Sequence, residues 1–396
     1  MPTRDRRLKV PMAGLAVATA VALTAGCSEG TATRNAAAET KTTTPPAPTI
    51  AISPAQGSDK VRPDKPVVVT AEGGALDEVV VKAGGKQLDG EFDENRTRWE
   101  SKERMRPSTG YTVAAKATGE GGPATATSDF TTLKPKSELA IADVTPTLKG
   151  EKVGVGAPII VTFNIPVKNR AAVEKSLKVK AQKPVKGAWR WIDDTKVIYR
   201  TAKYWPAHQK VRFTADLVGL HAGDGSFGVK NHAATIRIGA RQISTVDTRR
   251  KTMTVKRDGK TVQNMLISAG RATTREYTTT SGVHLTMDKR NPERMISPNR
   301  EKGDPGYYDL MIDHAVRISN SGEYVHAKNN VADQGRRNVS HGCINARPDQ
   351  ARWFYNNSQR GDVVNITGTN RALEWNNGWG FWQMSFKEWK KGSALR

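Results

Sequence analysis

Cysteine is scarce in this chain, which has two in 396 residues, Cys27 and Cys343. The spacings typical of zinc sites, such as paired CxxC or HExxH, are absent. His326, His341 and Cys343 could supply three ligands but leave no evident fourth, so we predict no metal site. The β-rich stretches described below also lack the cysteine pair that many small extracellular domains use as a staple.

The N-terminal apolar stretch, Val10–Leu23, is too short and too rich in small residues for a stable membrane span. It follows the basic residues Arg4, Arg6, Arg7 and Lys9 and ends in Leu23-Thr24-Ala25-Gly26-Cys27. This ending resembles the lipobox of bacterial lipoproteins and predicts a signal peptide over 1–26 and lipidation of Cys27. Several acyl chains would anchor the protein to the outer face of the bacterial cell membrane, at the cell wall. An ordinary secretory signal with an incidental cysteine is the alternative.

Acidic residues are in the minority: the chain has 39 Asp and Glu but 62 Lys and Arg, which gives a formal net charge of +23. The basic residues are spread through the chain, without aromatic interleaving or a helix-turn-helix pattern, so we predict no nucleic-acid partner. Anionic lipid headgroups and acidic wall polymers are the expected polyanions. A general contribution to solubility accounts for the charge equally well.

Helical periodicity is rare before residue 348, and short β-type runs dominate. Residues 27–48 are rich in Thr, Ala and Pro and predict a flexible tether. Alternating or β-branched runs then recur, as in Val67–Thr70, Val79–Val81, Ile159–Ile165 and Val211–Leu217. We predict a mainly β protein with two immunoglobulin-like β-sandwiches, over 49–135 and 136–240, that meet near Lys134-Pro135-Lys136.

A third β-rich domain is predicted over 241–367, with a hairpin turn at Asp258-Gly259. Its clearest helix is Pro348–Asn357, which Gly361-Asp362 separates from a strand over 363–366. The extension 368–396 contains Trp375, Trp379, Trp382 and Trp389. We expect these rings to pack onto the third domain, with a sugar-binding platform or a membrane-interface motif as alternatives.

Cys343 lies in the run Asn338-Val339-Ser340-His341-Gly342-Cys343-Ile344-Asn345. A lone thiol in an exported protein is either a buried small hydrophobe or a nucleophile, and a nucleophilic cysteine needs a base or a positive neighbour. His341 shares a face with Cys343 if the segment is extended, and His326 can approach from a separate strand; spacing alone does not choose between them. Gly342 lets the backbone turn so that consecutive N–H groups point at a developing oxyanion. Ser340 and Asn345 would hold the loop.

Ser340-His341-Gly342-Cys343-Ile344-Asn345, with His326 upstream and 351–366 downstream, resembles the signature of the L,D-transpeptidase catalytic domain, the YkuD-type fold. The resemblance covers about 241–367. The lipobox, the pair of Ig-like domains and the Trp-rich extension together resemble the actinobacterial, mycobacterial-type members.

The resemblance implies Cys343 as nucleophile, His326 as general base and the Ala327 backbone carbonyl as the third member, where relatives often have Ser. It implies an oxyanion site from Tyr308 and the N–H groups of Gly342 and Cys343. The implied substrate-binding residues are Met287, Tyr308, Ser321, Gly322, Ser340, His341 and Asn345. Met287 would begin a lid that runs to Tyr307 and is longer than in relatives.

The implied reaction is acyl transfer on peptidoglycan stem peptides: Cys343 attacks the third residue of a tetrapeptide, releases D-Ala, and a second stem resolves the thioacyl-enzyme as a 3→3 cross-link. Water in place of the amine would make an L,D-carboxypeptidase. No cofactor is required, carbapenems would acylate Cys343, and we expect a monomer. The alternatives are a wall-binding lipoprotein with a weakly active catalytic domain and a general cysteine peptidase. His208, His221, His232, His284 and His314 are expected at the surface or at caps.

Overall fold

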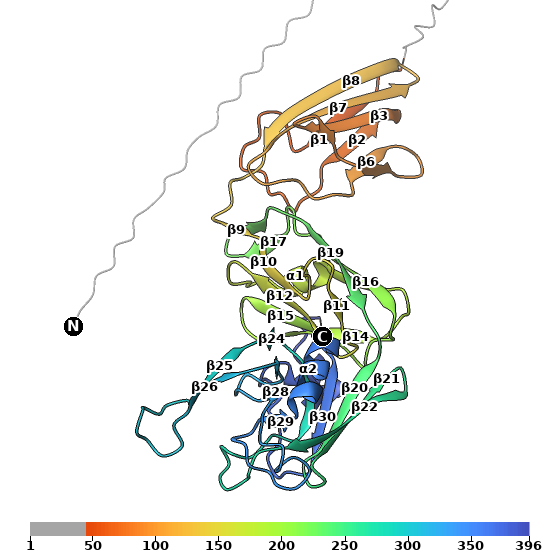
Figure 1. Ribbon diagram of the computed structural model, residues 1–396. Helices are drawn as coiled ribbons and strands as arrows, with labels where there is room; N and C mark the ends of the chain where they lie inside the picture. The colour runs from red at the N-terminus through yellow and green to blue at the C-terminus, as the bar shows by residue number, and fades with distance from the viewer. Residues whose placement is uncertain (1–44, 396) are drawn as a thin grey trace, which may run out of the picture. The chain divides into compact units, whose positions relative to one another are not determined.

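The computed structural model describes residues 45–395 (Figure 1). The predicted signal peptide 1–26, Cys27 and most of the predicted tether 27–48 lie outside this range. Strands dominate the described chain, so the prediction of a mainly β protein is confirmed. None of the helices between residues 45 and 395 has the length and apolar character needed to cross a membrane.

The first predicted sandwich consists of two four-stranded sheets, ordered β1-β2-β6-β5 and β4-β3-β7-β8. The two sheets pack face to face around one hydrophobic core that includes Leu76, Trp99 and Met105. Gly84 and Gly85 both have positive φ, which permits the tight turn between β3 and β4. The strands are β1 Thr49–Ser53, β2 Val68–Glu72, β3 Ala75–Ala83, β4 Lys86–Gln87, β5 Gly90–Phe92, β6 Arg98–Ser101, β7 Gly110–Gly119 and β8 Gly122–Thr131.

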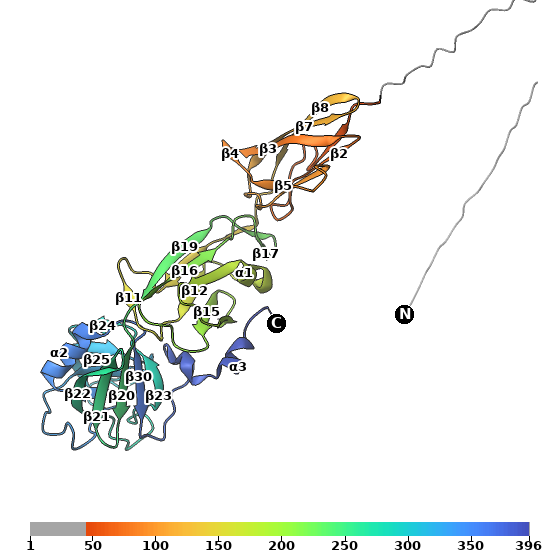
Figure 2. The same ribbon diagram turned by 90° about the vertical axis from the view of Figure 1, so that its right-hand side faces the viewer.

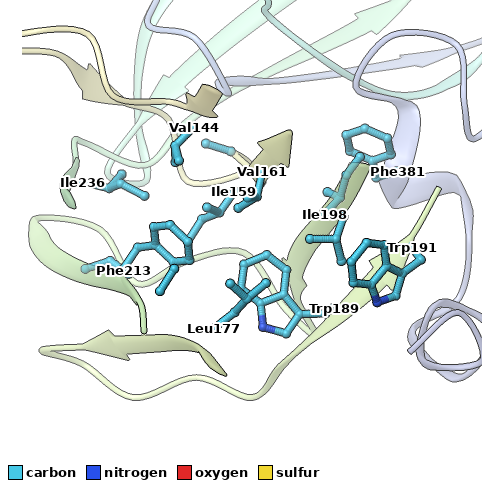
Figure 3. Close-up of a cluster of buried hydrophobic side chains, with 14 of the residues drawn as sticks. Val144, Ile159, Val161, Leu177, Trp189, Trp191, Ile198, Phe213, Ile236 and Phe381 are labelled. Carbon is cyan, nitrogen blue, oxygen red and sulfur yellow. The ribbon is translucent and has the colours of Figure 1, made fainter. Parts of the chain in front are cut away.

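The second predicted sandwich has sheets ordered β10-β12-β15-β14 and β11-β19-β16-β13, with a small sheet β17-β18-β9 beside them. Trp189 packs edge-on against Phe213 in its core, with ring centroids 5.9 Å apart (Figure 3). Helix α1, Arg170–Ser176, was not predicted, because its two turns are too short to show a period. The strands are β9 Ser137–Leu139, β10 Ile141–Thr145, β11 Lys152–Val153, β12 Ile159–Phe163, β13 Leu177–Ala181, β14 Gly187–Trp191, β15 Lys196–Thr201, β16 Gln209–Ala215, β17 His221–Gly223, β18 Ser226–Gly228 and β19 His232–Ile238.

The third unit is built on a nine-stranded sheet ordered β23-β30-β20-β21-β22-β29-β28-β27-β24, part of which Figure 2 shows with α2. Helix α2, Pro348–Asn357, is the helix that the sequence predicted, with proline in its first turn. A separate hairpin is formed by β25, Glu293–Ile296, and β26, Asp309–Ile312. The sheet strands are β20 Gln242–Asp247, β21 Thr252–Arg257, β22 Lys260–Ser268, β23 Gly282–Leu285, β24 Lys289–Arg290, β27 Ala315–Arg317, β28 Tyr324–Ala327, β29 Ile344–Ala346 and β30 Val363–Thr367. The exact limits of the domains stay a prediction.

The extension ends in a 3₁₀ turn, η1 Gly380–Gln383, and helix α3, Phe386–Lys390. The Trp389 ring is fully buried and its Nε1–H donates to the Ala188 carbonyl in β14, at 3.0 Å. Buried Arg200 in β15 donates to the carbonyls of Phe381 and Met384. The expectation of packing on the third domain alone was therefore too narrow, since tryptophan density predicts burial but does not identify the surface that provides it.

Candidate active site

Cys343 directly precedes β29, which lies between β22 and β28 in the sheet. Strand β28 runs parallel to β29 and places His326 beside Asn345. This pairing brings His326 and Cys343, which are 17 positions apart in the sequence, to one pocket, because the loop between the strands returns the chain to the same edge of the sheet. Parallel neighbours need such a connection, and here the loop carries the Ser340–Cys343 turn.

Two hollows meet at Cys343. The first, of about 190 Å³, is lined by Met295, Tyr308, Leu310, Ile312, His326, Lys328, Asn330, Val339, Ser340, His341, Cys343 and Asn345. The second, of about 420 Å³, also reaches Cys343 and includes Tyr308, Arg317, Ser321, Gly322 and Tyr324. The structure therefore brings together every implied site residue except Met287 and Ala327, which line neither hollow. Ala327 contributes only through its carbonyl.

Cys343 as a residue is partly exposed, while its thiol points inward and donates to the Gly322 carbonyl at 3.5 Å. Its surroundings raise the thiol pKa to about 12, chiefly through burial, while the Tyr324 backbone N–H favours the thiolate and Glu323 opposes it. The resting side chain is a neutral thiol. A nucleophile in this state needs a base that removes its proton as it attacks.

His326 is 5% exposed, and its Nδ1 lies 2.9 Å from the Ala327 carbonyl oxygen. A carbonyl only accepts, so Nδ1 carries the hydrogen and Nε2 keeps its lone pair. The pKa of His326 is lowered to about 4, chiefly by burial; the Ala327 carbonyl acts in the opposite direction, and Lys328 adds a smaller lowering. The imidazole is thus neutral at pH 7 and able to accept a proton. Within residues 45–395 no direct hydrogen bond joins it to Cys343.

Gly342 has φ of 126°, a backbone conformation that a side chain would strain. Its N–H donates to Ser340 Oγ at 3.1 Å, and Ser340 Oγ donates to the Cys343 carbonyl at 2.6 Å. Ser340 therefore shapes the turn, as expected. The Gly342 N–H, which the resemblance assigned to the oxyanion, is already occupied in this conformation.

His341 stacks between two tyrosines. The Tyr308 ring is parallel to it, with centroids 5.3 Å apart, and the Tyr277 ring is tilted at 4.5 Å. Burial raises the pKa of Tyr308, and Cys343 and Glu276 add to this effect, so the hydroxyl stays a hydrogen-bond donor. The stack with His341 fixes the Tyr308 ring in the lining of both hollows that reach Cys343. Tyr277 was not found by sequence analysis, which had no spacing pattern to connect it with His341.

Ser321 and Gly322 lie on the loop between β27 and β28, against the C-terminal extension. Asn377 Oδ1 accepts from the Ser321 N–H at 3.0 Å, and Asn377 Nδ2 donates to Ser321 Oγ at 2.9 Å. Met287 does not reach Cys343: it packs near Gly378, and its N–H donates to the Arg317 carbonyl. The structure thus gives Met287 a packing position at the extension rather than a place in the pocket.

Three polar residues behind Cys343 escaped sequence analysis: Thr280, His284 and Glu323. His284 is fully buried, so its expected surface or capping position was wrong. The only sequence signal was that Glu323 directly follows Ser321-Gly322, two implied substrate-binding residues, and a carboxylate that becomes buried there needs a partner. Among residues 45–395, no cluster of three or more His, Cys, Asp or Glu side chains is placed to hold a metal.

Comparisons with known proteins identify two kinds of domain in this chain. Residues 241–366 match the L,D-transpeptidase catalytic domain, and residues 58–221 match a bacterial Ig domain, a single match that spans parts of both predicted sandwiches.

L,D-transpeptidase 2 of Mycobacterium tuberculosis is 33% identical over 354 residues, which cover 88% of this chain and 85% of the relative. L,D-transpeptidase 5 of the same species is 32% identical over 364 residues, 89% of this chain and 78% of the relative. A solved structure of the L,D-transpeptidase LdtMt1 in complex with imipenem is similar over 59% of this chain and 100% of that one, with 31% identity and a TM-score of 0.50. The chain therefore belongs to the L,D-transpeptidase family.

Proposed function

We propose that this protein cross-links peptidoglycan by 3→3 acyl transfer through a thioacyl-enzyme on Cys343. The observation that carries the proposal is a single thiol at the meeting point of two hollows, with a neutral imidazole in one of them. An acyl transferase must admit a donor and an acceptor to the same carbonyl carbon, and two approaches to one sulfur meet that need.

In the first half-reaction the Cys343 sulfur attacks the carbonyl carbon of the third stem residue while His326 Nε2 takes the thiol proton. The oxyanion would accept hydrogen bonds from the Cys343 N–H and the Tyr308 hydroxyl; each such donor is typically worth about 3–4 kcal/mol in the transition state. Collapse breaks the peptide bond, and the imidazolium returns the proton to the departing amine of D-Ala. A thioester remains on Cys343.

In the second half-reaction the side-chain amine of a neighbouring stem attacks the thioester. His326 Nε2 now takes a proton from that amine and transfers it to the departing sulfur, which restores the thiol and leaves the new amide bond. The Ala327 carbonyl, at 2.9 Å from Nδ1, stabilises the imidazolium in both halves. Ser321, Gly322 and Asn345 line the two hollows and would bind the stems.

We further propose that residues 1–26 are removed as a signal peptide and that Cys27 carries the lipid anchor. The monomeric protein would then act from the outer face of the cell membrane, with the Ig-like pair as a spacer. Labelling cells with a radioactive or clickable fatty acid tests this anchor: a Cys27→Ala variant should lose the label, and a label that persists would contradict it.

The reaction is tested by mass spectrometry of residues 28–396 incubated with a purified disaccharide-tetrapeptide, beside a Cys343→Ala control. A 3→3 dimer that is absent from the control is expected. A tripeptide alone would identify an L,D-carboxypeptidase, a second candidate that the partial exposure of Cys343 to water favours. Equal products from enzyme and control would refute the role of the thiol. A wall-binding protein would instead retain sacculus binding in the Cys343→Ala variant and show no turnover in either form.

A further inference from the structure

Thr280, His284 and Glu323 form one buried, hydrogen-bonded cluster behind Cys343. These residues are 2%, 0% and 4% exposed. The Thr280 N–H donates to Glu323 Oε1 at 2.7 Å, and Thr280 Oγ1 lies 2.6 Å from Glu323 Oε2. The same hydroxyl lies 2.7 Å from His284 Nε2. The other ring nitrogen, Nδ1, lies 3.1 Å from the Gly282 carbonyl oxygen.

The contacts of this cluster determine how many hydrogens it holds. A carbonyl oxygen only accepts, so His284 Nδ1 carries a hydrogen. The Thr280 hydroxyl has one hydrogen but two short contacts, to His284 Nε2 and Glu323 Oε2. With a neutral imidazole and an ionised carboxylate, one of these contacts would have no hydrogen. One additional proton satisfies all of them.

That proton belongs on His284. Burial by itself raises the pKa of Glu323, but the nearby His284 and the hydrogen bonds from Thr280 outweigh it and leave the pKa below its ordinary value. His284 Nε2 and Glu323 Oε2 lie 3.6 Å apart, within ion-pair distance. The cluster is therefore an imidazolium and a carboxylate joined by a hydroxyl, and the paired charges reduce the cost of burying either one.

The cluster is connected to the sulfur through the backbone on both sides of Glu323. The preceding residue, Gly322, accepts from the Cys343 thiol at 3.5 Å. The backbone N–H of the following residue, Tyr324, lowers the pKa of the same thiol. Fixing the Glu323 carboxylate thus fixes the two neighbouring backbone groups that act on the thiol, of which the Gly322 carbonyl contacts it directly.

A neighbouring threonine holds the other side of the turn. The Thr279 hydroxyl donates to the Gly342 carbonyl at 2.7 Å and accepts from the Gly270 N–H at 2.8 Å. Residues 279 and 280 therefore hold the Gly342–Cys343 turn and the Gly322–Tyr324 segment together. The relative position of these two segments sets the surroundings of the sulfur.

We propose that Thr280, His284 and Glu323 are positioning residues for Cys343, built as a buried imidazolium–hydroxyl–carboxylate cluster. The positioning part rests on the proposed role of Cys343 as the nucleophile. The imidazolium also offsets the field of the Glu323 carboxylate, which would otherwise disfavour negative charge on the sulfur and on the nearby oxyanion.

Nitrogen NMR of the histidine rings tests how many protons the His284 ring carries. The sample is the protein from residue 28 to residue 396, without any peptide substrate. At pH 7 we expect both ring nitrogens of His284 to be protonated. In Glu323→Gln the amide can donate to Thr280 Oγ1, whose hydrogen then points to His284 Nε2, so every contact is kept with one proton fewer. His284 should become the neutral Nδ1–H tautomer. A neutral His284 in the unaltered protein would overturn the cluster as proposed.

Alkylation of Cys343 by iodoacetamide, followed by intact mass, tests positioning independently of cross-linking. We expect Thr280→Val to change the rate about tenfold or more, since a misplacement of about 1 Å can alter a reaction rate up to about 100-fold. Thr280→Ser should restore it. Thr278→Val is the matched control, because this buried hydroxyl donates to the Thr274 carbonyl instead. Thr280→Ala replaces the valine variant if the latter does not fold. An unchanged rate in a folded variant without the hydroxyl would overturn the positioning role.

The experiments distinguish failure of the proposed reaction at Cys343 from failure of the proposed role of the cluster. If the NMR and alkylation results hold while Cys343→Ala retains full turnover, the cluster stands and the proposed reaction falls. If turnover requires Cys343 but the Thr280 variants alkylate normally, the reaction stands and the cluster loses its role. Measuring kcat and KM of the Thr280 variants separates positioning of the thiol from binding of the stem. Loss of a positioning residue lowers kcat, whereas loss of a stem contact raises KM.

Discussion

The resting charge state of Cys343 and His326 predicts an unusual reactivity for a catalytic cysteine. With a pKa raised to about 12, about one thiol in 10⁵ is ionised at pH 7. An ordinary cysteine near pKa 8.5 is ionised to about 3% at that pH. The more basic thiolate is intrinsically more nucleophilic, by roughly 40-fold, and this partly offsets the smaller fraction of thiolate. We therefore expect iodoacetamide to alkylate Cys343 about 100-fold more slowly than free cysteine at pH 7.

The assay is the alkylation rate of residues 28–396 between pH 6 and 10, followed by intact mass, with Cys343→Ala as the blank. The rate should rise about tenfold per pH unit throughout. His326→Gln should leave this rate nearly unchanged, because the neutral imidazole does not stabilise a resting thiolate. The same variant should lower peptide turnover by about 10²–10⁴-fold, the usual contribution of a general base. A rate plateau with a midpoint below pH 8 that His326→Gln abolishes would refute the neutral pair and indicate a resting thiolate–imidazolium.

Three further predictions concern stability and the extension. Burial raises the pKa of Asp362 to about 7, so the folded state retains a proton that the unfolded state releases above about pH 3.8, and stability falls as pH rises through this window. Asp362→Asn should therefore raise the melting temperature at pH 8 more than at pH 4, and equal shifts at both would contradict the burial argument. Trp389→Ala should lower the free energy of unfolding in urea by about 3–5 kcal/mol, because a fully buried ring leaves a cavity; a loss below 1 kcal/mol would mean that α3 is loosely packed. Asn377→Ala should lower kcat in the mass-spectrometric assay by releasing the Ser321–Gly322 loop, whereas unchanged kinetics would confine Asn377 to a structural role.

Local patterns in the chain were sufficient for many elements. Asp258 and Gly259 both adopt positive φ between β21 and β22, as an Asp-Gly pair between alternating runs requires. Helix α2 begins at Pro348, which suits a first turn where a missing N–H costs nothing. Alternation located β12 and β16 because each buries one face. These features depend on neighbours in sequence, so the sequence suffices to predict them.

In the candidate site, too, some residues could be identified from the sequence and others only from the structure. The Ser340–Asn345 motif and His326 were visible because their residue types are rare and their chemistry is distinctive. Spacing left His326 and His341 as equal candidates for the base. The structure gives them different surroundings: the register of β28 against β29 sets His326 beside Asn345, and two tyrosine rings hold His341 in a stack, which supports His326 as the proposed base.

By itself the sequence determined a mainly β chain, the family motif around Cys343 and the residue types available for acyl transfer. Only the tertiary structure decided that Asn377 holds Ser321, that Met287 lies at the extension, and that His284 is buried with Thr280 and Glu323. These contacts join residues far apart in the chain. Their geometry follows from strand order and burial, and burial also sets the pKa values of Cys343 and His326, since the loss of water disfavours the charged form of each.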